Sequence, residues 1–108
     1  MAITPKILGQ AKPAALTTVT LFTVTSSNTV EFSIYINNQS KLYDGYSIAL
    51  VPNGSAQTAA SQLAFNTQLD GGTTTAFSGL YLNSGDRVLV SSTFGNCSFT
   101  ATGIDFSP

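Results

Sequence analysis

The segment Thr29–Asn37 constrains the fold more than any other part of the sequence. Apolar and polar residues alternate along its whole length. The apolar residues are Val30, Phe32, Ile34 and Ile36, and the residues between them are Glu31, Ser33, Tyr35 and Asn37. Because successive side chains of a strand point to opposite faces, this period of two predicts a β-strand with one buried face.

Similar apolar segments occur along the rest of the chain, separated by Gly, Asn, Asp, Ser and Pro residues that are typical of turns. The segments predicted as strands are Leu16–Thr25, Tyr46–Val51, Gln62–Leu69, Thr73–Leu82, Asp86–Phe94 and Cys97–Phe106. The only helix predicted is a turn or two at Ala56–Ala60. We therefore expect an all-β fold, a single antiparallel β-sandwich of about eight strands that is jelly-roll-like.

Several local features give expectations that a structure can test. A change of the apolar face between Leu21 and Phe22 predicts a bulge or bend in that strand. Asp44-Gly45 is a strong turn signal. The strand Tyr46–Val51 is apolar on both faces and is therefore expected to be central in its sheet, and in Gln62–Leu69 we expect Leu63 and Phe65 to point inward.

Residues 1–15 do not read as helix or strand, because Pro5 and Pro13 interrupt them. We expect an extended N-terminal arm over 1–15 and a β-sandwich domain over 16–108. The arm carries the apolar residues Ile3, Ile7 and Leu8. These residues could anchor the arm on its own domain or on a neighbouring subunit, and we favour the neighbour, with Ile3, Pro5, Ile7 and Leu8 as contact residues.

Only 8% of the residues are charged, and the formal net charge is −1. Nucleic-acid binding needs a basic patch, which four scattered Lys and Arg residues do not predict. Few charges suit a surface partly covered by neighbours, although a β domain that simply uses hydroxyl side chains explains the composition as well. No apolar segment is long enough to cross a membrane, and no signal peptide follows Met1, so we expect synthesis in a cytoplasm.

The residues that carry most enzyme chemistry are missing or scattered. The chain has no histidine, which excludes Ser-His-Asp and Cys-His machinery and the commonest transition-metal ligand. Each acidic residue stands alone, and Asp44, Asp70 and Asp86 lie beside glycines, where they are expected to cap turns. The single cysteine, Cys97, is expected in the core. We predict no enzyme activity, no cofactor and no metal; calcium bound by the Asp70 loop is the alternative.

Two further residues are candidates for partner contacts. Tyr35 lies on the polar face of its strand, where it could contact a partner or a glycan, or simply cover its cross-strand neighbours. Arg87 is the only arginine and follows the turn Asn83-Ser84-Gly85-Asp86. We expect it to pair with an acid of its own domain or of a neighbour, and we favour an acid of its own domain.

Taken whole, the chain resembles small virion structural proteins of tailed bacteriophages. The likeness covers most of the chain, and the stretches that carry it are Ile3-Thr4-Pro5-Lys6-Ile7-Leu8-Gly9-Gln10-Ala11-Lys12-Pro13, Asn37-Asn38-Gln39-Ser40 and Leu82-Asn83-Ser84-Gly85-Asp86-Arg87-Val88-Leu89-Val90. The resemblance implies a β-sandwich located in a virion and no catalytic residues.

The leading hypothesis is a capsid decoration (cement) protein that binds the major capsid protein and forms a homotrimer or dimer. Alternatives are a tail, neck or baseplate component, and a carbohydrate-binding module for host attachment that uses Tyr35 or Tyr81. No nucleic-acid or membrane partner is expected.

Overall fold

The computed structural model describes all residues, 1–108, and almost all of its regular structure is strand. One turn of 3-10 helix, Ala59–Ser61, is the helical element. The strands are β1 Ala2–Ala11, β2 Val19–Thr23, β3 Thr29–Asn38, β4 Asp44–Val51, β5 Gln62–Leu69, β6 Thr74–Leu82, β7 Arg87–Ser92 and β8 Cys97–Ser107. No helix is long and apolar enough to cross a membrane.

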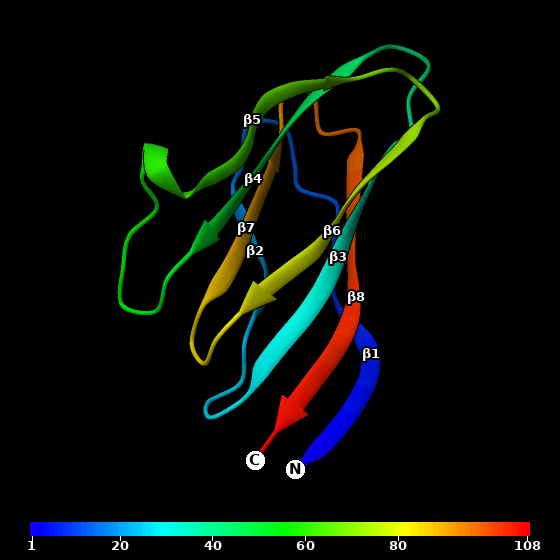
Figure 1. The fold of residues 1–108 in the computed structure, drawn as a ribbon. Coiled ribbons are helices and arrows are strands. Elements are labelled where there is room, and N and C mark those ends of the chain that lie inside the picture. The colour runs from blue at the N-terminus through cyan, green and yellow to red at the C-terminus, as the bar shows by residue number, and fades with distance from the viewer.

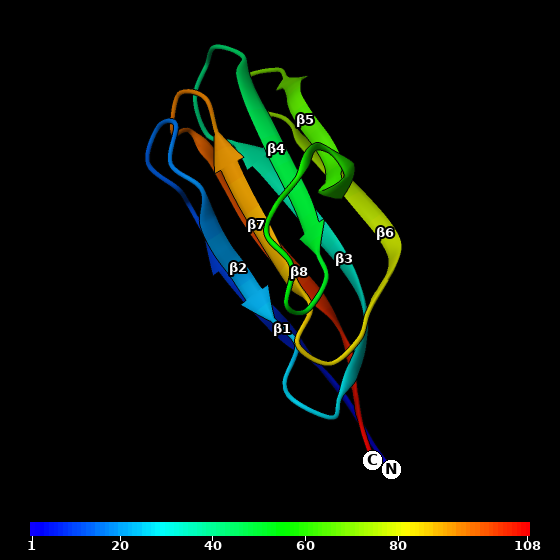
Figure 2. The same cartoon turned by 90° about the vertical axis from the view of Figure 1, so that its left-hand side faces the viewer.

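The strands form two antiparallel four-stranded sheets that face one another (Figures 1 and 2). The strand orders are β1-β8-β3-β6 and β2-β7-β4-β5. The first strand thus pairs with the last, the second with the seventh, the third with the sixth and the fourth with the fifth. This is one long hairpin rolled up, which joins β8 to β3 and β7 to β4 and defines a jelly roll. The predicted all-β sandwich is confirmed.

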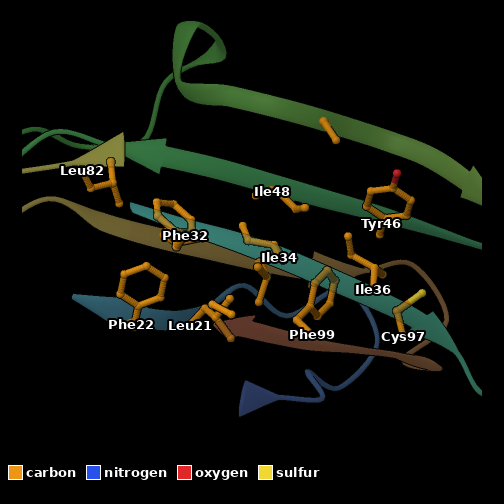
Figure 3. Close-up of a cluster of buried hydrophobic side chains, with 14 of the residues drawn as sticks. Leu21, Phe22, Phe32, Ile34, Ile36, Tyr46, Ile48, Leu82, Cys97 and Phe99 are labelled. Atoms are coloured by element: carbon orange, nitrogen blue, oxygen red, sulfur yellow. The ribbon is translucent and has the colours of Figure 1, made fainter. Parts of the chain in front are cut away.

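The core lies between the two sheets and contains the residues that the alternating sequence pattern predicted to be buried. Val30, Phe32, Ile34 and Ile36 of β3 are all buried. They meet side chains from the opposite sheet, including Ile48 and Tyr46 of β4 (Figure 3). Phe99, Ala101 and Cys97 of β8 complete this layer, and the predicted burial of Cys97 is confirmed. Burying a Val, Leu, Ile or Phe side chain contributes about 1.5–3 kcal/mol, so this layer is the main source of stability.

The predicted irregularity in the first apolar strand is also present. The register of β2 against β7 shifts between Thr20 and Phe22. As a result Leu21 and Phe22 are both buried, although they are consecutive. The ring of Phe22 meets the ring of Phe32 edge to face, with centroids 5.1 Å apart. A bulge therefore lets this edge strand contribute two large side chains to the core.

Two local predictions were wrong. Asp44-Gly45 does not form a turn but begins β4, and Asp44 is fully buried. Phe65 points outward and is 68% exposed, whereas Ala64 is buried and Leu63 packs partly against the core. The cause is irregular pairing: the register of β5 against β4 shifts on both sides of Ile48, which breaks the simple alternation.

The predicted N-terminal arm is extended, but it is not separate from the sandwich. Ala2–Ala11 forms the edge strand β1, which pairs along its length with β8. At Gly9 it approaches β2 so closely that a Cβ would collide with the carbonyl oxygen of Leu21. Residues 2–7 are all exposed, and the ends of β1 and β8 project together at one end of the molecule (Figure 1). The boundary expected after residue 15 is therefore corrected, since residues 2–11 are part of the sheet.

Candidate assembly surface

The outer face of the β1-β8-β3-β6 sheet carries an exposed apolar patch at its β1 edge. Residues that oppose one another in an antiparallel ladder lie on the same face. Ile3 opposes Phe106, Pro5 opposes Ile104, and Ile7 opposes Thr102. Ile104 in turn opposes Glu31 on β3, whose outward position follows from its buried neighbours. The outward apolar side chains of β1 and β8 therefore lie next to one another.

We call this set the β1–β8 patch; its members are Ile3, Pro5, Ile7, Ile104 and Phe106. Ile3 and Ile7 are 58% and 60% exposed, and Ile104 and Phe106 are partly exposed. Contiguous exposed apolar surface on a soluble protein commonly marks a site of interaction. The position at a sheet edge adds a second mode of contact, because the outer side of β1 has no strand paired to it.

A shallow hollow adjoins the patch on the same sheet. It encloses about 200 Å³ and is lined by residues of β3, β6 and β8, among them Glu31, Ile104 and Gly79. Across Glu31 from Ile104 lies Tyr81, which is mostly exposed. The face is thus apolar at its β1 edge, with a single carboxylate and a phenol farther in, which gives a partner both apolar and hydrogen-bonding groups.

A polar cluster of Lys6, Asn28 and Asp105 connects β1 and β8 on the face opposite to the β1–β8 patch. The Nζ of Lys6 lies 3.0 Å from Oδ2 of Asp105. The Nδ2 of Asn28 donates to Oδ1 of the same carboxylate at 3.0 Å. Asp105 is nearly buried, while the Lys6 side chain is about half exposed, so the ion pair adds modestly to stability. Lys6 lies between Ile3 and Ile7 in β1 and has the opposite parity, so its side chain leaves the strand on the other face.

The structure separates the remaining predicted contact residues from the patch. Leu8 packs partly against the core, because the register of β1 shifts between Ile7 and Gly9. Tyr35 lies on the same outer face, opposite Thr100 and therefore farther along the strands, and is 45% exposed. Arg87 lies on the other sheet, where its Nη2 donates to the carbonyl oxygen of Ser55 at 3.0 Å. The expectation that Arg87 pairs with an acid in its own domain was wrong.

Ile104 and Phe106 belong to the patch but were not among the predicted contacts. The sequence contained a usable signal. Cys97 was predicted in the core, so the even-numbered positions of the same strand were expected to point outward. What the alternation could not show is that β1 lies beside β8, because pairing between the two ends of a chain leaves no local pattern.

The buried acid Asp44 has a structural role. Its Oδ1 accepts hydrogen bonds from the backbone N–H groups of Gly45 and Phe94, at 2.7 and 2.9 Å. Its Oδ2 accepts from the N–H of Asn96 and the hydroxyl of Ser92, at 3.0 and 3.1 Å. Burial alone would raise the pKa of this carboxyl, but these hydrogen bonds outweigh it and lower the pKa below 3.8. Asp44 thus connects β4 to the β7–β8 loop.

The remaining polar chemistry is also structural. Asp86 accepts a hydrogen bond from the backbone N–H of Asn83, which is the local capping predicted for it, and a second, long-range one from the N–H of Asn53. Burial, followed by the nearby charge of Asp44, raises the pKa of the Cys97 thiol to about 12. A thiol with such a pKa is not a nucleophile at neutral pH. No group of three or more His, Cys, Asp or Glu residues is placed to hold a metal ion.

A second exposed apolar group lies at the end of the sandwich formed by the β3–β4 and β7–β8 loops. It consists of Leu42, Tyr43 and Phe94, and we call it the loop cluster. The rings of Tyr43 and Phe94 meet edge to face, with centroids 6.2 Å apart. Because these residues are on loops and share no sheet edge, the loop cluster offers a smaller and less regular surface than the β1–β8 patch.

Comparison with known proteins finds a shared fold. No protein-family model and no curated protein sequence matches the chain. A chain in the structure of the infectious bursal disease virus Gx strain superposes on 96% of this chain with a TM-score of 0.52 and 12% identity. A chain of the VP2 subviral particle of infectious bursal disease virus covers the same share, with a TM-score of 0.45 and 14% identity.

This chain spans only about a third of the length of those viral chains, 31% and 32% respectively. At such low identity the likeness extends to the fold and carries no residue roles across. The comparison therefore shows that this chain has a jelly-roll fold that also occurs as part of a viral particle protein.

Proposed function

We propose that this protein is a structural component of a virion, acting by binding, and that it is a capsid decoration (cement) protein of a tailed bacteriophage. Three features support the proposal. The jelly roll is shared with a chain of a viral particle, the surface has few charges, and the β1–β8 patch leaves apolar side chains exposed. No catalytic or metal-binding group forms part of the proposed role.

The β1–β8 patch is the observation that carries the proposal. A free protein gains nothing by exposing Ile3 and Ile7 on a regular sheet face, whereas burying them against a neighbour is favourable. The unpaired outer side of β1 could in addition accept a strand from that neighbour. A flat apolar face beside an open sheet edge suits a partner that is itself a β-rich coat protein.

The proposed partner is the major capsid protein, and the protein itself is proposed to form a trimer or dimer. On a symmetric lattice each weak contact is repeated, so an oligomer binds far more tightly than one subunit does. The site of action is the virion, after synthesis in the host cytoplasm. A tail, neck or baseplate position would use the same surface and is the alternative.

The experiment is to replace both isoleucines of the patch and measure binding to particles. The double variant Ile3→Thr/Ile7→Thr retains β-branched side chains, so the strand should be preserved. Full burial of one isoleucine side chain contributes about 1.5–3 kcal/mol. Replacing both should therefore weaken binding to particles that lack the protein by more than about tenfold. Occupancy is measured by cryo-electron microscopy over a protein concentration series.

The matched control is Leu42→Thr, which removes an apolar side chain of the loop cluster that is 75% exposed. It should leave occupancy unchanged, and both variants should retain wild-type stability to within about 0.5 kcal/mol. Wild-type occupancy of the double variant would contradict the proposal. The particle map also decides the position, since a decoration protein repeats over the lattice and a tail protein occupies a ring.

A further inference from the structure

The outer face of the other sheet, β2-β7-β4-β5, carries a groove of different character. It encloses about 190 Å³ between the segment before β2 and the start of β5. Ten residues line it, only Leu16 and Phe65 are apolar, and none is charged. A second hollow of about 450 Å³ shares Gln62 and Phe65 with it, so these two residues line both spaces. Figure 2 shows this sheet with the β4–β5 connection in front of it.

Two lining residues hold unusual backbone conformations. Leu16 and Asn66 have φ angles of +58° and +46°, in the left-handed region that non-glycine residues rarely adopt. Each is fixed by a hydrogen bond: the N–H of Leu16 donates to the carbonyl oxygen of Ser92 at 3.0 Å, and that of Asn66 to the hydroxyl of Ser47 at 2.9 Å. Strained residues that tertiary contacts hold in place are concentrated at binding sites.

Gln62 supplies the second observation. Its Oε1 atom is buried and has no hydrogen-bond partner, the one such side-chain atom in the protein. An unpaired buried acceptor is unfavourable, because it has lost water without gaining another donor. Gln62 itself lines the groove, so a turn of its side-chain amide toward the groove would let a ligand hydroxyl supply the missing donor. The side-chain amide of Gln57 and the hydroxyls of Ser91 and Thr93 lie along the same groove and can donate or accept.

Phe65 supplies the third observation. Its ring is 68% exposed although phenylalanine is usually buried, and it lines the groove beside Gln62. The face of an aromatic ring is electron-rich and attracts weakly positive C–H groups. A pyranose ring presents C–H groups on its faces and hydroxyl groups around its edge. An aromatic platform beside amide and hydroxyl groups is complementary to both.

We propose that this groove binds a neutral saccharide, with one sugar ring stacked on Phe65 and a hydroxyl hydrogen-bonded to the side-chain amide of Gln62. The absence of charged lining residues disfavours phosphorylated or acidic sugars, which would leave their charge unpaired. The site lies on the sheet opposite the β1–β8 patch, so a virion protein bound through that patch would keep the groove accessible. The proposal does not depend on the virion role.

The test uses the full-length protein on an array of immobilised glycans that includes neutral glucans, galactans and mannans, polymers of N-acetylhexosamine, and acidic glycans. Binding is expected to be restricted to neutral glycans. An aromatic contact of this kind corresponds to an affinity change of up to about tenfold, which multivalent display amplifies. Phe65→Ala and Gln62→Ala should therefore each remove most of the signal, and Phe65→Tyr should retain it.

The controls are Tyr35→Ala and Tyr81→Ala, which remove exposed aromatic rings from the other sheet and should leave the signal unchanged. Thermal unfolding of every variant verifies that it is folded. For the best neutral oligosaccharide, an NMR titration should shift the amide resonances of Leu16, Phe65 and Asn66. Absence of binding to every neutral glycan, preference for acidic glycans, or loss of signal only in the tyrosine variants would overturn the proposal.

Discussion

Replacing Asp44 with asparagine tests how far one buried carboxylate stabilises the β7–β8 end of the sandwich. The carboxylate accepts hydrogen bonds from three backbone N–H groups and one hydroxyl. An amide of the same shape has only one oxygen, and its NH₂ group must face donors. In the better orientation NH₂ replaces Oδ2, so that the hydroxyl of Ser92 can turn and accept, but the N–H of Asn96 is left without an acceptor.

The expected cost follows from that geometry. One unpaired buried N–H group costs about 1–3 kcal/mol, and the other hydrogen bonds lose the extra strength given by a charged acceptor. We expect Asp44→Asn to lower the free energy of unfolding by about 2–4 kcal/mol at neutral pH. Urea denaturation followed by circular dichroism measures it. Asp70→Asn is the control, because Asp70 is exposed, and it should change stability by less than about 0.5 kcal/mol.

The pH dependence gives an independent test. The pKa of Asp44 is lower in the folded protein than its ordinary value of 3.8. Its stabilising effect is therefore complete above pH 3.8 and is lost as the pH falls through the lower folded-state pKa. The difference between wild type and Asp44→Asn should shrink in that acidic range. A loss below about 1 kcal/mol at neutral pH, or a difference that does not shrink in acid, would refute the reasoning.

Three further predictions concern the core and the edge strand. Gly103→Ala should lower the free energy of unfolding by about 1–3 kcal/mol in urea denaturation, because the new Cβ would collide with the carbonyl oxygen of Glu31; an unchanged midpoint would contradict this. Cys97 should not react with a thiol reagent in the native protein at neutral pH but should react once denatured, since burial raises its pKa to about 12; fast native reaction would contradict it. Deleting residues 1–11 should destabilise the domain as well as weaken particle binding, because β8 loses a paired strand; its thermal midpoint should fall, and an unchanged midpoint would show that β1 contributes no stability.

The alternating segment Thr29–Asn37 was sufficient to predict its own strand and its buried face, because strand periodicity is a local property of the chain. The similar segments along the rest of the chain predicted the all-β class. The same holds for the bulge near Phe22, where two apolar residues in succession cannot share one face of a regular strand. Burial of Cys97 was equally predictable, since its nearest neighbours are polar and Phe99 shares its parity.

The tertiary structure decided those features that depend on pairing between segments far apart in the sequence. Residues 1–15 were predicted as an arm because Pro5 and Pro13 interrupt them, yet pairing with β8 makes residues 2–11 a strand. Asp44 was predicted to lie in a turn. In the structure it is a buried acceptor for backbone N–H groups that are about fifty residues away in the sequence. Phe65 faces solvent because β5 shifts register against β4.

Both candidate sites arise in the same way. The β1–β8 patch requires the two ends of the chain to lie side by side, and the groove requires Leu16 and Gln62 to meet across a sheet. Alternation assigns each residue to a face of its own strand, but only the order and register of the strands decide which residues share that face with it.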